Sequence, residues 1–94
     1  MTRALFPLGQ LVQTPGAEAS VPRERILECL QLHVSGVWGE LDNHDKRANQ
    51  DALRHGDRLL SSYFIDPAKP LEGKFWIITE ADRSSTCVLL PEEY

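Results

Sequence analysis

The side chains best suited to chemistry in this sequence are two cysteines, three histidines and a run of carboxylates. Cys29 and His33 are four positions apart, so on a helix they would be neighbours, the spacing of a metal-ligand pair or of a thiolate and its base. No second C-x-x-C or H-x-x-x-H pair is present to complete a zinc site. Cys29 also lies beside an apolar helical stripe, where a buried and inert thiol is the ordinary outcome. We therefore expect neither a metal centre nor a cysteine nucleophile.

The carboxylates Glu40, Asp42 and Asp45 are close enough in sequence to hold a divalent cation. Capping of a following helix already explains Asp42 and Asp45, because carboxylates are favoured at the positive end of a helix. The sequence contains no glycine-rich phosphate loop, nucleophile elbow or dinucleotide fingerprint. These observations favour a protein that is not an enzyme, with no catalytic residues, no metal and no cofactor.

Composition narrows the class of protein further. The chain has 94 residues, of which 41% are hydrophobic, so we expect a single domain over residues 1–94. No apolar run approaches the roughly 20 residues needed to cross a membrane, and residues 1–11 do not resemble a signal peptide, so the expected location is the cytoplasm without a membrane partner. In that setting Cys29 and Cys87 are expected to be reduced, although a bond between them stays open.

The net charge of −4 comes from ten basic and fourteen acidic residues. This balance disfavours direct binding of nucleic acid, which requires a face rich in lysine and arginine. It permits the opposite role, in which acidic side chains approach a basic surface of another protein.

The strongest strand pattern lies in residues 74–90, where two apolar and β-branched runs flank a polar segment. The pattern predicts an antiparallel hairpin in which Phe75, Ile77 and Thr79 share one face. Glu80, Asp82 and Arg83 lie at its tip, either as a solvated turn or as a contact loop held out by the hairpin. Residues 57–65 form a further expected strand, which completes a meander after the loop 66–73, and residues 4–13 are a possible edge strand.

Two helices are expected before these strands. The first runs from Val21 to His33 or Val34 and stops at Gly36, and the second runs from Asn43 to His55, capped by Asp42 and closed by Gly56. Asp51 lies on the polar face of the second helix. Between the helices, Trp38 is either packed against them, with its indole N–H bonded to a carbonyl, or exposed as an interface anchor. The pattern predicts an α+β fold, with two helices packed on a small antiparallel sheet of three to four strands.

Several blocks together resemble a family of short proteins carried on plasmids and integrative elements of proteobacteria. The blocks are residues 8–10 with 14–17, residues 33–41 (HVSGVWGEL), and residues 76–84 (WIITEADRS) with 89–94 (LLPEEY). Departures from the family fall in residues 18–28 and in the loop 66–73. The resemblance implies a setting on mobile genetic elements, in which small acidic proteins frequently inhibit CRISPR effector complexes or restriction enzymes.

The sequence as a whole therefore predicts a non-enzymatic, acidic inhibitor that occupies a nucleic-acid-facing surface of a host defence nuclease complex. The expected partner-binding residues are Trp38, Glu40, Asp42, Asp45, Asp51, Glu80, Asp82 and Arg83. The alternative is a regulatory or accessory protein of mobile-element maintenance that acts as a homodimer through a sheet edge or Trp38. A third class, a cysteine- or metal-dependent enzyme, is less favoured by the residues.

Overall fold

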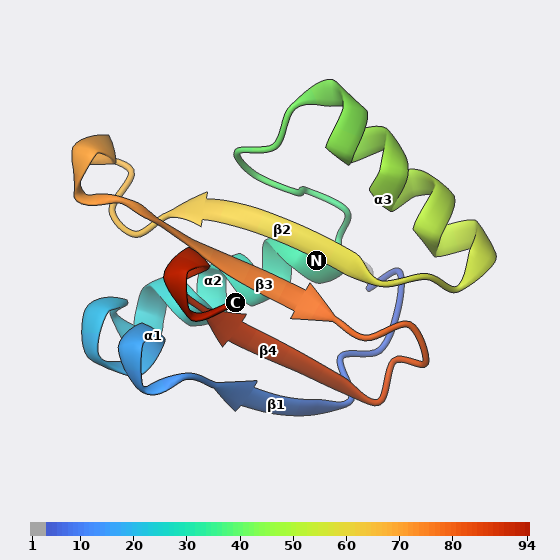
Figure 1. Cartoon of the computed structure of the whole chain (residues 1–94), viewed down its shortest axis with the longest axis horizontal. Helices are drawn as coiled ribbons and strands as arrows, with labels where there is room; N and C mark the ends of the chain where they lie inside the picture. Colours follow the sequence, from blue (N-terminus) through green and yellow to red (C-terminus); the bar gives the residue numbers. More distant parts are fainter. Residues whose placement is uncertain (1–3) are drawn as a thin grey trace.

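The computed structural model describes residues 4–94, which form a four-stranded sheet with its main helix on one face (Figure 1). The elements in chain order are β1 (Gln10–Gln13), α1 (Pro15–Ser20), α2 (Arg23–Val34), α3 (Asn43–His55), β2 (Leu59–Phe64), the short turn η1 (Pro70–Glu72), β3 (Lys74–Thr79), β4 (Ser85–Leu89) and the short turn η2 (Pro91–Glu93). The strand order across the sheet is β1-β4-β3-β2. The predicted α+β class is confirmed.

The hairpin of β3 and β4 forms the centre of the sheet, as predicted. Phe75, Ile77 and Thr79 alternate along β3 and are all fully buried on the face covered by α2. The helix contributes Ile26 and Leu30 to the same cluster. In Figure 1, α2 lies behind the sheet and η2 lies in front of it. The apolar alternation of the hairpin therefore decides which face of the sheet the helix covers.

The second long helix, α3, has the predicted bounds and caps. An oxygen of Asp42 accepts a hydrogen bond from the backbone N–H of Asp45 at 2.8 Å, and Gly56 closes the helix with φ of 73°. Only Asn49 and Ala52 are buried along its length. The helix packs against β2 at one edge of the sheet (Figure 1), so most of its circumference remains exposed.

The N-terminal part differs from the prediction in two respects. Residues 15–20, for which the sequence predicted no helix, form the short helix α1, whose first turn is capped by the Thr14 hydroxyl. The edge strand starts at Gln10 and runs parallel to β4, so the sheet is mixed rather than wholly antiparallel. Gly9 explains this start, because it has φ of 66° and a Cβ there would lie 2.4 Å from the Ser84 carbonyl oxygen.

Two further expectations concern single features of residues 4–94. No helix in this part of the chain is both long and apolar enough to cross a membrane. Cys29 and Cys87 are free thiols, which resolves the question of a bond between them.

Candidate partner-binding surface

Three of the expected carboxylates gather at the start of α3. Glu40, Asp42 and Asp45 are exposed, and we refer to them as the acidic end of α3. The backbone N–H of Glu40 donates to the Ser62 carbonyl at 2.6 Å, and Asp42 caps the helix. Within residues 4–94, no lysine or arginine forms an ion pair with these three side chains. The negative charges of the acidic end are therefore not paired with a lysine or arginine of the described residues. The backbone that carries them is fixed by these hydrogen bonds.

Asp51 lies further along α3 and is also exposed. Its carboxylate is 4.0 Å from the Arg54 guanidinium, and the helix carries Lys46 and Arg47 as well. The helix beyond its first turn therefore bears both signs of charge. The acidic character of α3 is concentrated at its N-terminal end.

The same region contains a possible cation-binding group, although not the one grouped from the sequence. The ligand atoms of Asp42, His44 and Asp45 lie within 4.8 Å of one another, and all three side chains are exposed. Glu40 does not belong to this group. Helix capping by Asp42 and the 3.4 Å contact between His44 and Asp45 explain the arrangement without an ion.

At the hairpin tip, Glu80 is engaged by a neighbouring cation. The Arg58 guanidinium donates from Nε to Oε2 of Glu80 at 3.1 Å and from Nη2 to Oε1 at 3.3 Å. Its third nitrogen, Nη1, donates to the Tyr94 hydroxyl at 2.8 Å. The charge of Glu80 is therefore already balanced within the protein by a bidentate guanidinium pair.

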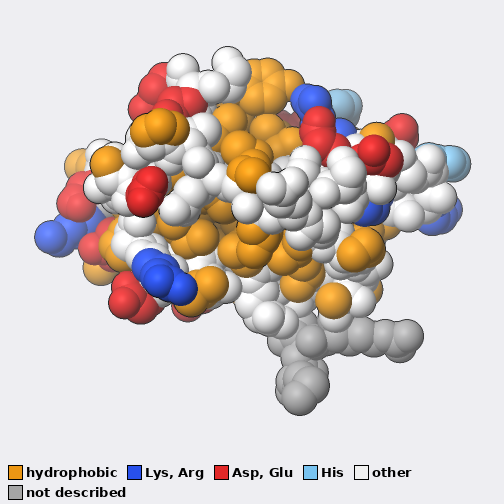
Figure 2. Space-filling model, turned by 90° about the horizontal axis from the view of Figure 1, so that it is seen from below, with side chains coloured by type: hydrophobic (Ala, Val, Ile, Leu, Met, Phe, Trp, Pro, Cys, Tyr) orange, Lys and Arg blue, Asp and Glu red, His pale blue; other side chains and the backbone are white. Residues whose placement is uncertain are grey.

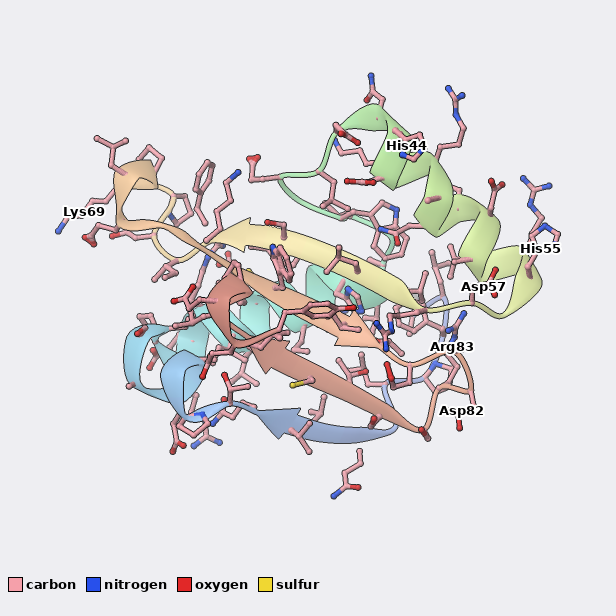
Figure 3. The ribbon with its side chains drawn as sticks, in the orientation of Figure 1. His44, His55, Asp57, Lys69, Asp82 and Arg83 are labelled. Carbon is pink, nitrogen blue, oxygen red and sulfur yellow. The ribbon has the colours of Figure 1, made fainter. Side chains whose placement is uncertain are left out.

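Asp82 at the same tip is exposed and directed outward (Figure 3). Hydrogen bonds from the hydroxyl and the backbone N–H of Ser84 hold the pKa of this carboxyl below its ordinary value. Asp82 is thus a charged, solvent-facing group of a fixed turn. The turn and contact-loop interpretations are both compatible with this position.

Arg83 turns inward from the tip, toward the junction of α3 and β2 (Figure 3). Its backbone is left-handed, with φ of 61°, and its guanidinium lies 5.6 Å from the centre of the Phe6 ring. The guanidinium donates at 2.6 to 3.2 Å to the backbone carbonyls of Ala52, Asp57, Glu80 and Ala81. Arg83 therefore fixes the hairpin tip against the C-terminal end of α3. Nη1 and Nη2 are thus already engaged with backbone carbonyls, in contrast to the outward specificity contact expected from the sequence.

Trp38 is buried, with 3% of its surface exposed. Its ring stacks on Phe6 with the ring centres 6.4 Å apart, and the His33 ring meets it edge-on. The packed alternative is confirmed, and the assignment of Trp38 as a surface anchor is wrong for this conformation. The expected carbonyl partner is not found either, because Nε1 has no hydrogen-bond partner within residues 4–94.

A buried chain of polar side chains runs through the core beside Trp38. The Thr86 hydroxyl donates to the Leu8 carbonyl at 2.7 Å, so it accepts from Thr79, also at 2.7 Å. Thr79 must then accept from Nε2 of His33, 2.9 Å away. Nδ1 of His33 is left as the acceptor for the Ser61 hydroxyl. One neutral tautomer of His33 therefore satisfies the whole chain.

Electrostatics agree with this assignment. Burial lowers the pKa of His33 to about 4, and the nearby positive charge of Arg83 acts in the same direction. Burial also raises the pKa of the Cys29 thiol to about 11. Ser61 and His33 are fully buried, so no substrate reaches their contact in this conformation. Cys29 and His33, the pair singled out from the sequence, are therefore both buried groups of the core.

Sequence reasoning missed the polar contacts that attach α3 to the sheet. The side-chain amide of Asn49 donates to the Leu60 carbonyl at 2.6 Å and accepts from the Leu60 N–H at 3.1 Å. An asparagine in the interior of a helix is a weak signal of such a contact, because this residue usually favours caps and turns. The Arg58–Glu80 pair and the role of Arg83 left no signal in local sequence.

Comparison with known proteins adds no relative. No family model, curated protein or solved structure matches this chain.

Proposed function

We propose that this protein is a non-enzymatic inhibitor of a host defence nuclease complex, either a CRISPR effector or a restriction enzyme. It would act in the cytoplasm by occupying a surface on which the nuclease binds nucleic acid. The observation that carries the proposal is the acidic end of α3. Glu40, Asp42 and Asp45 are exposed there, and none of the lysines and arginines within residues 4–94 forms an ion pair with them.

Charge and rigidity support this assignment. Surfaces that bind nucleic acid present lysine and arginine to the phosphates, so they attract fixed carboxylates of a competing protein. The acidic end is held by the helix cap and by the Glu40–Ser62 backbone bond, which lowers the entropy lost on binding. Asp82 and Asp51 add exposed negative charge at the hairpin tip and along α3.

The link to defence nucleases comes from the resemblance to short proteins of plasmids and integrative elements. A mobile element benefits from blocking the nucleases that would degrade it, and a small acidic binding protein is suited to that task. The fold alone indicates no function of this kind.

The test removes charge while leaving the helix cap intact. We would combine Glu40→Gln, Asp42→Asn and Asp45→Asn, because asparagine caps a helix about as well as aspartate. The matched control is Glu24→Gln, Glu72→Gln and Glu92→Gln, which removes the same charge from exposed positions elsewhere. The measurement is the association rate with the nuclease complex that the protein inhibits, at several salt concentrations.

We expect the first variant to associate at least about ten times more slowly than the control at low salt, with a weaker salt dependence. Equal rates for the two variants would exclude the acidic end as the contact site. A partner that is not a nucleic-acid-binding complex would exclude the proposed function itself.

One observation favours the alternative, a homodimeric accessory protein of mobile-element maintenance. Among residues 4–94, no strand pairs with the outer edge of β1, and strand pairing through such an edge is a common route to a dimer. Light scattering distinguishes a stable dimer from a monomer. A dimer that leaves every defence nuclease active would favour the alternative.

A further inference from the structure

The two edges of the sheet differ in whether their outward backbone groups have hydrogen-bond partners. At the β2 edge they do. Alternate residues of β2 turn their backbone away from β3, and each of them has a partner. Leu60 is bonded through both its N–H and its C=O to the side-chain amide of Asn49. Ser62 exchanges backbone bonds with the segment 38–40, at 3.1 and 2.6 Å. The carbonyl of the last residue of β2 accepts from the Arg25 guanidinium at 3.0 Å.

The β1 edge is open. The N–H groups of Gln10 and Thr14 donate to β4 carbonyls at 3.0 Å, and a parallel pair is bonded through alternate residues. Leu11 and Gln13 therefore direct their N–H and C=O groups outward. Within residues 4–94, no other strand, loop or side chain bonds to them. The strand also lacks the charges and prolines that usually protect an exposed edge.

An apolar groove of about 440 Å³ accompanies this edge, between β1 and α2. Leu11 and Leu27 are about half exposed beside it, and Figure 2, which views the molecule from below Figure 1, shows apolar side chains gathered across the face. The apolar side chains that line it are Leu11, Val21, Ile26, Leu27, Leu30 and Val88. Its charged members are one acid, Glu18, and one base, Arg23. The groove has no net charge, in contrast to the net charge of −4 on the whole chain.

We propose that the open edge binds a second copy of this chain, with the two β1 strands antiparallel about a two-fold axis at Val12. In this register Leu11 of each copy lies opposite Gln13 of the other. These are the residues whose backbone groups point outward, so each pair exchanges both its N–H···O bonds. The two Val12 side chains meet at the axis, on the sheet face opposite α2. The edge is thus complementary to itself, as a two-fold interface requires.

The groove supports the same occupant. Antiparallel pairing of the two edges joins the sheets into one and places both α2 helices on the same face, where the two grooves adjoin. The exposed side chains of Leu11 and Leu27 are then covered by their counterparts. Each copy brings one Glu18 and one Arg23 to the contact, so the two grooves carry no net charge that would repel. A basic partner would be attracted to the acidic end of α3 rather than to this groove.

A dimer through this edge is the state that the accessory-protein alternative requires, and it is equally compatible with the inhibitor proposed above. The β1 edge lies across the whole sheet from α3, so the acidic end of α3 stays accessible in the dimer. Loss of the dimer and loss of nuclease inhibition are therefore separate outcomes.

The test changes Val12, because the proposed two-fold axis brings this residue of one copy against the same residue of the other. Val12 is 43% exposed, so a charged side chain fits there without opening the core. Val12→Glu and Val12→Lys each place like charges opposite one another, which destabilises a strand pair. An equimolar mixture of the two variants instead places opposite charges at the axis. Molar mass is measured by light scattering after size-exclusion chromatography, with circular dichroism to confirm folding.

We expect the unmodified chain to run at twice its monomer mass of 10.6 kDa. Each variant alone should run as a monomer, and their mixture should recover the dimer. Leu71→Glu, which adds the same charge at a fully exposed position away from this edge, should remain dimeric. An unmodified chain that stays monomeric at high concentration would overturn the proposal. This result would also be seen if the edge instead binds a strand of another protein. A mixture that stays monomeric would overturn the register about Val12.

Discussion

Acidification should destabilise this protein through His33 before most of its carboxylates are protonated. The imidazole is fully buried, and each of its nitrogens bonds to a hydroxyl: Nδ1 to Ser61 and Nε2 to Thr79. A proton added to Nδ1 would place a charge in the core and would face the donor hydrogen of Ser61. The neutral form is therefore the one that the fold stabilises.

The size of the effect follows from the two pKa values. Burial lowers the pKa of His33 from its ordinary 6.5 to about 4 in the folded protein. Because the folded pKa lies below the unfolded one, the unfolded chain takes up the proton first as the pH falls. The stabilisation is complete above pH 6.5 and is lost between pH 6.5 and pH 4. At about 1.4 kcal/mol per pKa unit, the loss is about 1 kcal/mol at pH 5.5 and about 3 kcal/mol by pH 4.

The assay is urea unfolding followed by circular dichroism across this pH range. The control is His33→Gln, which is expected to be less stable at every pH but has no imidazole to titrate. We expect the free energy of unfolding of the unmodified protein to fall more steeply between pH 6.5 and pH 4 than that of the variant. Parallel pH profiles would refute the buried, neutral histidine, because carboxylates alone would then explain the acid sensitivity.

Two further expectations concern the contacts that hold α3 and the hairpin tip. Asn49→Ala leaves both backbone groups of Leu60 without their partner at the β2 edge, so it should lower the free energy of unfolding by about 2 kcal/mol in thermal denaturation. A change below about 0.5 kcal/mol would mean that this edge is not held by the amide. Arg83→Ala should lower the free energy of unfolding by a similar amount, because it removes the donors to four carbonyls. Arg83→Gly should lower it by about 1 kcal/mol less, because glycine adopts φ of 61° freely. Equal stability of the two Arg83 variants would contradict the backbone part of this reasoning.

The elements with strong local patterns were predictable from the sequence. The helix from Asn43 to His55 matches its prediction at both ends, because Asp42 and Gly56 are local capping signals. The hairpin was predictable because Phe75, Ile77 and Thr79 alternate on a two-residue period. In both cases the information lies within a few residues of the element.

Features that depend on distant parts of the chain were not predictable. The parallel pairing of β1 joins residues 10–13 to residues 85–88, and nothing in either segment specifies the other. The helix α1 was not predictable because its six residues are too few to show a helical period. Arg83 looked like an available surface cation, since its four acceptors are backbone carbonyls, which carry no signature in sequence.

The candidate site was predictable only in part. Glu40, Asp42 and Asp45 are exposed at one end of α3, as charge and capping suggested. Glu80 is instead paired with Arg58, which is 22 residues away in sequence. Trp38 is buried among Phe6 and His33, because the flanking glycines let the segment turn its ring into the core. Of the expected contact residues, the structure leaves the carboxylates of Glu40, Asp42, Asp45, Asp51 and Asp82 exposed.

The most direct test of the proposed function is survival of a targeted plasmid in cells that carry a defence nuclease. Transformation efficiency would be measured for a panel of CRISPR and restriction systems, with and without this protein. We expect the protein to restore transformation against at least one system. The variant that combines Glu40→Gln, Asp42→Asn and Asp45→Asn should lose that effect, while the matched control should keep it. No restoration with any system, or full activity of the neutralised variant, would contradict an inhibitor that acts through the acidic end of α3.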